Sequence, residues 1–408
     1  MIIGENGTAK TSLLQAIAMA AAGSREVNSL AKAVTGYLRD RRHDEAMEIT
    51  ATFGFLAPPK GVARAFIDRP PTSRDADVQI SSTVKLPEGS SSLHARSRYS
   101  APRMASADPL TEARDKNLRY WFVAGYGIAR ALPDASQRLV WQKPSIERME
   151  PLFPGSRAGL TSTAFADYLS GAKNDAYRDA LNSVLFRTKR LLPRISALEL
   201  RRPGDIQNAS DLAEQNRILQ RVGAQDLAIP TAALSHGYQS TIAWIADLVG
   251  HIILDAEIAL QPDDMQGLVL IDEIDLYLHP TWQIALISAL RETFPQVQFV
   301  ATTHSPLVLA GMHPTEIVRL QFADNGDVER APIGDDARIM TATEIYREYF
   351  GIDDIIPDPT GQKLRSYRYL AANPYRSDSD DSEMTRLRDE LLQLGVDPAF
   401  DPVPRAAP

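Results

Sequence analysis

Two carboxylates directly follow a run of four aliphatic residues in this sequence. Asp272 and Glu273 come after residues 268–271, a run that predicts a strand buried on both faces of a parallel sheet. Open α/β sheets hold their ligands at the carboxyl ends of such strands. Asp272 suits Mg²⁺, which prefers oxygen ligands and keeps several waters, and Glu273 could orient or deprotonate an attacking water. The alternative is a strand that ends in a solvated acidic turn.

A second group of residues fits the phosphate-loop pattern G-x-x-x-x-G-K-[ST]. Gly4, Lys10 and Thr11 match the pattern, Ala9 replaces its second glycine, and Gly7 is an additional glycine. Such a loop turns backbone N–H groups toward phosphate oxygens, and the positive end of the next helix, predicted over about residues 11–22, points to the same place. Lys10 would reach the β- and γ-phosphates and the Thr11 hydroxyl would bind Mg²⁺. The alternative is a strand–turn–helix whose glycines serve geometry alone.

Two further segments carry polar groups at the ends of predicted elements. Ser235 and Gly237 stand where an apolar helix begins, so a hydroxyl, free N–H groups and the helix dipole could bind an anion there. His304 follows a predicted strand over residues 297–301 and could donate to a phosphate oxygen. Each has a plainer interpretation, an ordinary helix N-cap for Ser235 and a structural histidine for His304.

These residues must be positioned by a mixed set of strands and helices. Buried strands are predicted over residues 118–128, 268–271 and 297–301, and alternating residues predict antiparallel strands over 47–53, 62–67 and 78–86. Residues 87–110 are rich in Ser, Pro and Arg and predict a long loop. The strand at 118–128 ends in Gly125-Tyr126-Gly127 and Arg130, which could present groups to a nucleotide or form only a turn.

Composition limits the class of protein. The chain has 408 residues, 44% of them hydrophobic, a net charge of −8 and no cysteine. These values are ordinary for a globular protein, exclude disulfides and thiolate metal sites, and fit a cytoplasmic location. No apolar run is long enough to span a bilayer, so no membrane partner is expected. Basic residues between Arg187 and Arg202 could contact nucleic acid or form a solvated face.

The four motifs occur in the order of ABC-type ATPase heads, and the sequence resembles the AAA-family ATP-binding proteins of the OLD, RecF, Septu and retron-associated type. The segments that carry the resemblance are Gly-Glu-Asn-Gly-Thr-Ala-Lys-Thr-Ser-Leu-Leu from Gly4, Leu-Ser-His-Gly-Tyr-Gln-Ser-Thr from Leu234, Ile-Asp-Glu-Ile-Asp-Leu-Tyr-Leu-His-Pro from Ile271 and Thr-Thr-His-Ser-Pro from Thr302. The resemblance implies a P-loop NTPase of the α/β class, with a mostly parallel core sheet, an antiparallel side sheet and a helical subdomain.

The resemblance also implies a mechanism in which two copies of the chain enclose two ATP molecules with Mg²⁺. Lys10, Glu273 and His304 take the catalytic roles, and Thr11 and Asp272 hold the metal. Residues of the partner copy complete each site. The residues expected to bind nucleotide are Gly4, Glu5, Asn6, Gly7, Thr8, Ala9, Lys10, Thr11, Ser12, Ser235, Gly237 and Gln239.

In function, the resemblance implies a slowly hydrolysing, dimerising switch that regulates a separate effector, a nuclease or toxin, in bacterial anti-phage defence. The alternatives are a RecF-like DNA-binding repair ATPase and an assembly module that binds ATP without hydrolysing it. The second alternative draws on Ala9 and on His236, which replaces a glycine of the common signature. The sequence after His304 has no acidic cluster that would indicate an intrinsic nuclease.

The predicted organisation is an ATPase head over residues 1–335 and a helical extension over 336–408 with a disordered end. Within the head, the side sheet is expected at about residues 46–87 and the helical part with the signature at about 160–258. The family's glutamine-bearing loop has only Gln137 and Gln142 as candidates.

Overall fold

The computed structural model of the chain forms two compact units, residues Met1–Ala342 and Thr343–Pro408. The residues that it describes are 1–38, 46–54, 79–100, 107–118, 121–132, 143–155, 165, 169–188, 191–200, 216–254, 260–352 and 358–405. The expected strand at 62–67 and the two glutamines Gln137 and Gln142 lie outside these residues.

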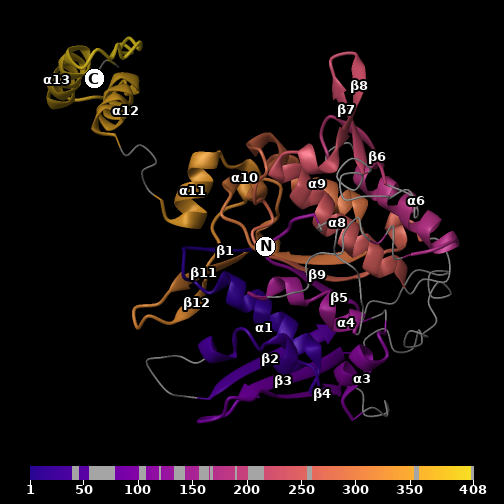
Figure 1. Cartoon of the computed structure of the whole chain (residues 1–408). Helices are drawn as coiled ribbons and strands as arrows, with labels where there is room; N and C mark the ends of the chain where they lie inside the picture. Colours follow the sequence, from indigo (N-terminus) through magenta and orange to yellow (C-terminus); the bar gives the residue numbers. More distant parts are fainter. Residues whose placement is uncertain are drawn as a thin grey trace. The chain divides into compact units, whose positions relative to one another are not determined.

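The core of the first unit is a sheet made of two three-stranded parts (Figure 1). One part has the order β10-β9-β5 and is parallel, and the other has the order β1-β11-β12, with only β12 antiparallel. A parallel bridge between Ile2 and Thr302 joins them. The strands are β1 (Ile2–Gly4), β5 (Val123–Tyr126), β9 (Gly267–Ile271), β10 (Val297–Ala301), β11 (Val318–Phe322) and β12 (Val328–Ala331). The mostly parallel core sheet is thus confirmed, and the carboxyl ends of β1, β5, β9 and β10 meet at one edge.

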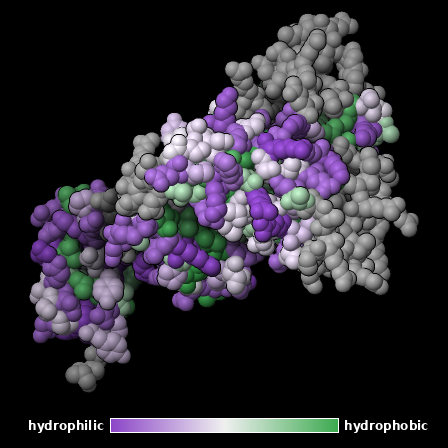
Figure 2. Space-filling model, turned by 90° about the horizontal axis from the view of Figure 1, so that it is seen from below, coloured by the Kyte–Doolittle hydropathy of each residue, from purple (hydrophilic) through white to green (hydrophobic). Residues whose placement is uncertain are grey.

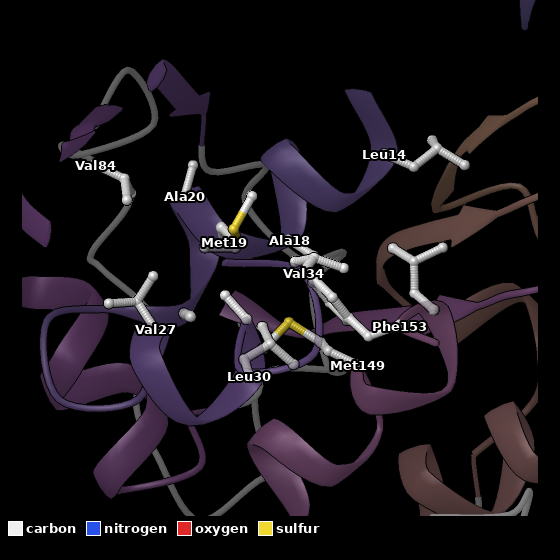
Figure 3. Packing of buried hydrophobic residues seen from close by; sticks show 14 of the residues in the cluster. Leu14, Ala18, Met19, Ala20, Val27, Leu30, Val34, Val84, Met149 and Phe153 are labelled. Atoms are coloured by element: carbon white, nitrogen blue, oxygen red, sulfur yellow. The ribbon is translucent and has the colours of Figure 1, made fainter. Parts of the chain in front are cut away.

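Helix α1 (Lys10–Ala22) lies between the core sheet and the side sheet (Figure 1). It buries apolar side chains toward both because its sequence is almost entirely Ala, Leu, Ile and Met after Ser12. Leu14, Ala18 and Met19 of this helix belong to one hydrophobic cluster with Val84 and Phe153 (Figure 3). This packing fixes the helix start, and therefore Lys10 and Thr11, against the sheet edge.

On the other face of the core sheet lie α8 (His236–Leu254) and α9 (Pro280–Thr293) (Figure 1). The ring of Trp244 on α8 packs against Tyr126 of β5 and Phe299 of β10, with centroid distances of 6.0 and 6.4 Å.

The first unit also has the helices and turns α2 (Val27–Leu30), η1 (Thr35–Tyr37), α3 (Pro109–Asp115), α4 (Pro144–Glu147), η5 (Glu150–Leu152), α6 (Ala172–Phe186), η7 (Thr231–Ala233), η8 (Pro262–Asp264), α10 (Pro306–Leu309), η9 (Pro314–Glu316) and η10 (Ala337–Ile339).

The antiparallel side sheet has the order β2-β3-β4 and extends further along the chain than predicted. Its strands are β2 (Met47–Gly54), β3 (Gln79–Leu86) and β4 (His94–Tyr99). Strand β4 falls in residues 87–110, which were expected to form a loop. The buried hydroxyl of Ser97 on this strand contacts Asp108 and accepts from the Leu110 amide. This buried position therefore holds a hydrogen-bonded polar side chain, and the sequence has no hydrophobic residue there that would predict a strand.

The part that carries the signature is not purely helical. Between α6 and α8 the chain forms a second antiparallel sheet of β6 (Ile195–Glu199), β7 (Arg217–Val222) and β8 (Gln225–Pro230). Strands β7 and β8 were not predicted, although Val222 pairs with Gln225 across a two-residue turn that begins with Gly223 at φ 63°. The helical subdomain is therefore a mixed one.

The second unit consists of α11 (Ala342–Phe350), α12 (Pro359–Ala372) and α13 (Asp378–Gln393), with α11 starting one residue before the unit boundary. Tyr367 and Ala371 of α12 pack on Met384, Leu387 and Leu391 of α13. The end of the chain, expected to be disordered, is held as far as Arg405. Its bonds are Val403 N–H to Ala371 O (2.9 Å), Arg376 Nη1 to Val403 O (2.7 Å) and Arg405 Nη2 to Arg376 O (2.6 Å).

Within the described residues, no helix has the length and apolarity that crossing a membrane requires. Figure 2 shows a largely hydrophilic surface on one face, with hydrophobic residues gathered in a few small groups.

Candidate functional site

The loop between β1 and α1 leads directly to the start of a helix that no side chain caps. Its exposed residues Glu5, Asn6 and Gly7 lead to the first turn of α1, which has no side-chain cap and no acidic residue. The N–H groups of that turn are therefore free to bind an anion, and the helix dipole favours one there. Gly4 cannot be replaced easily, because a Cβ atom would lie 2.5 Å from Leu320 O of β11 and 2.6 Å from Thr8 Oγ1.

Lys10 is 8% exposed and its ammonium group lies inside the loop. Its Nζ donates to Gly4 O at 2.9 Å and to Glu5 O at 2.8 Å. Burial lowers the pKa of Lys10, and the nearby charges of Asp272 and Glu273 act in the opposite direction. The two carboxylates that follow β9 are thus close to the lysine of the loop, although more than 250 residues separate them in the sequence.

Asp272 is the centre of a hydrogen-bond network at the sheet edge. Its Oδ2 accepts from Thr11 Oγ1 at 2.8 Å, and its Oδ1 accepts from Thr302 Oγ1 at 2.6 Å. Its backbone N–H donates to Tyr126 O of β5 at 2.8 Å. The structure therefore brings Thr11 and Asp272, the two predicted metal ligands, into direct contact.

The oxygen atoms of Thr11 and Asp272 fit Mg²⁺, which takes one or two protein oxygens and completes its shell with water and phosphate. Among the described residues there is no cluster of three or more His, Cys, Asp or Glu side chains that could hold a metal ion alone.

Glu273 has a left-handed backbone, with φ 46°. Its N–H donates to Thr302 Oγ1 at 2.7 Å, and its carbonyl oxygen accepts from Arg130 Nη2 at 2.7 Å. Thr302 is completely buried and was not among the predicted site residues. The sequence carried a signal for it, because a hydroxyl residue directly follows the strand at 297–301, whose neighbour in a parallel sheet is the strand that precedes Asp272.

His304 also follows β10, two residues after Thr302. Burial lowers its pKa, the charge of Lys10 lowers it further, and Glu273, Asp275 and Asp272 act to raise it. The ring is thus near both the loop lysine and the carboxylates. A lowered pKa leaves the imidazole neutral at physiological pH, so one ring nitrogen can donate a hydrogen bond while the other accepts.

The signature residues lie at the start of α8 and belong to a separate group. Gly237 packs against the loop after Glu273, where a Cβ atom would lie 2.6 Å from Tyr277 O. Gln239 Nε2 donates to Ala232 O at 3.0 Å and to Leu234 O at 2.9 Å, so it holds its own loop. In the described part of the chain, neither these two residues nor Ser235 forms a hydrogen bond with the phosphate loop.

The basic segment that suggested nucleic acid is only partly described. Arg187 forms an ion pair with Asp263 at 2.9 Å, which offsets the charge of Arg187 within this segment. Lys189, Arg190, Arg201 and Arg202 lie outside the described residues.

Comparison with known proteins gives one family match and several relatives. Residues 1–310 match the family described as "AAA domain, putative AbiEii toxin, Type IV TA system". The chain is 25% identical to the "Septu protein PtuA" of Bacillus mycoides over 96% of its own length and 46% of that protein. It is 38% identical to the "Retron Ec83 probable ATPase" of Escherichia coli over 36% of its own length and 27% of that protein.

The chain thus spans less than half the length of these relatives. Among solved structures, an SMC head bound to the C-winged helix domain of ScpA is similar, with 13% identity and a TM-score of 0.44 over 81% of this chain and 88% of that one.

Proposed function

The chain belongs to this family of AAA-domain proteins, and on that premise we propose that it binds ATP with Mg²⁺ and hydrolyses it slowly as a dimerising switch. The observation that carries the proposal is the convergence of Lys10, Thr11, Asp272, Glu273 and His304 at one sheet edge. If the acids after β9 formed only a solvated turn and the glycines before α1 served only geometry, nothing would require these two segments to lie side by side.

Each residue has a role that its contacts support. The N–H groups of the loop and the first turn of α1 bind phosphate oxygens, and Lys10 neutralises the β- and γ-phosphates. Thr11 and Asp272 would hold Mg²⁺, which neutralises charge that develops on the phosphates. His304, neutral and near Lys10, donates to the γ-phosphate.

Glu273 acts on the attacking water. It accepts a proton from the water as the oxygen bonds to the γ-phosphorus and the bond from that phosphorus to the β–γ bridging oxygen breaks, which yields ADP and phosphate. Its left-handed backbone and the two hydrogen bonds that hold it point to a side chain that is kept in one direction.

Ser235 and Gly237 act on the nucleotide of a second copy. Ser235 is exposed just before α8, Gly237 is buried in its first turn, and neither forms a hydrogen bond with the described phosphate loop of its own chain, which supports this arrangement. A site completed by two copies makes ATP a ligand of the dimer, because ATP binding and association then stabilise each other.

The switch regulates a separate effector, a nuclease or toxin, in bacterial anti-phage defence. Support for this role comes from the relatives whose names refer to Septu and retron systems. Their similarity does not extend over their whole length, so the effector is a proposal for this chain.

The test is ATP binding and turnover by purified protein with Mg²⁺, comparing the natural chain with Lys10→Ala and Glu273→Gln. We expect Lys10→Ala to lose ATP binding. We expect Glu273→Gln to bind ATP and to hydrolyse it at a rate lower by about 100-fold or more. Absence of ATP binding by the natural chain would refute the proposal, and an unchanged rate in Glu273→Gln would remove Glu273 from its role.

A further inference from the structure

A buried arginine lies directly behind the Glu273 turn. Arg130 follows the end of β5 by four residues and is 5% exposed. Because Tyr126 of β5 pairs with Ile271 of β9, the chain that leaves β5 runs beside the chain that leaves β9. Arg130 Nη2 donates to the carbonyl oxygen of Glu273 at 2.7 Å.

The charge of Arg130 lies among the carboxylates of the site. Burial lowers its pKa to about 10, and Asp272, Asp275, Glu273 and Tyr277 act in the opposite direction. The guanidinium remains a cation at neutral pH, and together with Lys10 it offsets the negative charge of three carboxylates that would otherwise repel one another.

The bond to Glu273 holds a strained peptide. A left-handed backbone is unfavourable for a non-glycine residue, so Glu273 needs partners that favour it. Thr302 holds the N–H of Glu273 and Arg130 holds its C=O. These two bonds fix both peptide groups next to the Glu273 Cα, and therefore the direction in which its side chain leaves the backbone.

A second buried arginine, Arg114, provides a comparison within the same chain. It is 3% exposed, its Nη2 donates to Trp121 O at 2.5 Å, and burial lowers its pKa to about 10. In both arginines, Nε and Nη1 are buried and have no hydrogen-bond partner among the described residues. The two differ in electrostatics: within the described part of the chain, the charges of Asp272, Asp275 and Glu273 raise the pKa of Arg130, while only burial shifts the pKa of Arg114.

We propose that Arg130 is a positioning residue for ATP hydrolysis, which fixes the Glu273 backbone and balances the carboxylates beside it. The inference rests on the proposed ATPase function. It assigns to Arg130 an effect on the rate of the chemical step and not on the binding of ATP, because its bond is to Glu273 and not to the phosphate loop.

The experiment compares Arg130→Gln, Arg130→Lys and Arg114→Gln in the full chain. A fluorescent ATP analogue gives the Kd with Mg²⁺, and single-turnover hydrolysis gives the rate. For Arg130→Gln we expect a Kd within about threefold of the natural chain and a rate lower by about tenfold or more. Arg130→Lys keeps the charge and a donor. Its rate should lie between that of the natural chain and that of Arg130→Gln.

Arg114→Gln is the matched control. It should lose thermal stability to a similar extent and keep both the Kd and the rate, since its carbonyl partner is remote from the site. A natural rate in Arg130→Gln overturns the proposal, as does an equal fall in Arg114→Gln. If Arg130→Gln does not fold, Arg130→Lys decides, with a fall of about threefold or more at unchanged Kd in favour and a natural rate against. Failure of the ATPase function itself would appear separately, as no turnover by the natural chain.

Discussion

At the scale of single residues, the site combines strained backbone with exact placement of hydroxyl groups. Ala9 and Glu273 both have left-handed backbones, and they lie at the two sides of the site, in the phosphate loop and in the acidic turn. Thr302 connects Asp272 and Glu273 through a single hydroxyl that donates to one and accepts from the other. Both features can be tested by substitutions that change few atoms.

Replacing Ala9 with Gly should stabilise the protein. Ala9 has φ 58°, so glycine removes a penalty of about 1–2 kcal/mol but adds backbone entropy to the unfolded chain, for a net gain of about 0.5–1 kcal/mol. Urea unfolding measures the gain, and ATP binding should persist because the backbone N–H remains. Ala399→Gly is the control, since Ala399 has φ 47° in the second unit and its replacement should leave ATP affinity unchanged. A less stable Ala9→Gly protein would contradict this account of the loop.

Replacing Thr302 with Val should slow hydrolysis by about tenfold or more and cost about 1–3 kcal/mol, because Asp272 and Glu273 each lose a buried partner. Single-turnover hydrolysis and chemical unfolding measure the two effects. Thr293→Val is matched to it, since Thr293 is also completely buried but its Oγ1 has no hydrogen-bond partner in the part of the chain that the structure describes. Thr293→Val should leave the free energy of unfolding unchanged or raise it. Equal losses of stability and rate in both variants would argue against the role of Thr302.

At the scale of elements, the signature helix is attached to the core sheet through a buried polar contact. Tyr126 of β5 donates to Asp247 Oδ2 of α8 at 3.1 Å, and His251 Nε2 lies 3.6 Å from the same oxygen. Burial and the negative charge of Asp247 raise the pKa of Tyr126 well above its usual value, so the phenol stays a donor. The strand that leads to Arg130 and the helix that begins with the signature are thereby linked.

Removing the phenol with Tyr126→Phe should destabilise the first unit by about 1–3 kcal/mol, because a buried carboxylate loses a donor. The free energy of unfolding in urea is the measurement. Tyr367→Phe in the second unit loses a bond to a backbone carbonyl, Phe400 O, and should cost only about 0.5–1.5 kcal/mol. If Tyr126→Phe cost less than Tyr367→Phe, the contact would not anchor α8.

At the scale of the whole molecule, the described part of one chain holds the phosphate loop and the signature as two separate groups. On the proposed mechanism a complete site requires a second copy, and each copy would contribute one group to each of two sites. The arrangement predicts that two inactive chains can complement each other.

Lys10→Ala disables the phosphate loop and Ser235→Arg blocks the signature, so neither variant alone should hydrolyse ATP. An equal mixture forms mixed dimers with one intact site each, and should recover roughly a quarter of the natural rate if the sites act independently. Steady-state phosphate release measures the recovery. A mixture as inactive as its components would indicate that the two groups do not meet between copies.

Much of the site was predictable because its chemistry is local in sequence. A loop that ends in Lys10-Thr11, two acids after an apolar run and a histidine after another are each recognisable within about ten residues. Strand β4 was not predictable in this way, because two of its three inward positions hold Ala95 and Ser97 and only Tyr99 is large. Strands β7 and β8 were missed because both are largely exposed and carry little hydrophobic alternation.

The sequence by itself determined the types of residue at the site and the ends of the strands that carry them, because short motifs and hydrophobic runs depend on near neighbours. Only the tertiary structure decided that Thr302 bridges Asp272 and Glu273, and that Arg130 holds the Glu273 carbonyl. These contacts depend on the order and register of β5, β9 and β10, which are set by hydrogen bonds between strands far apart in the chain.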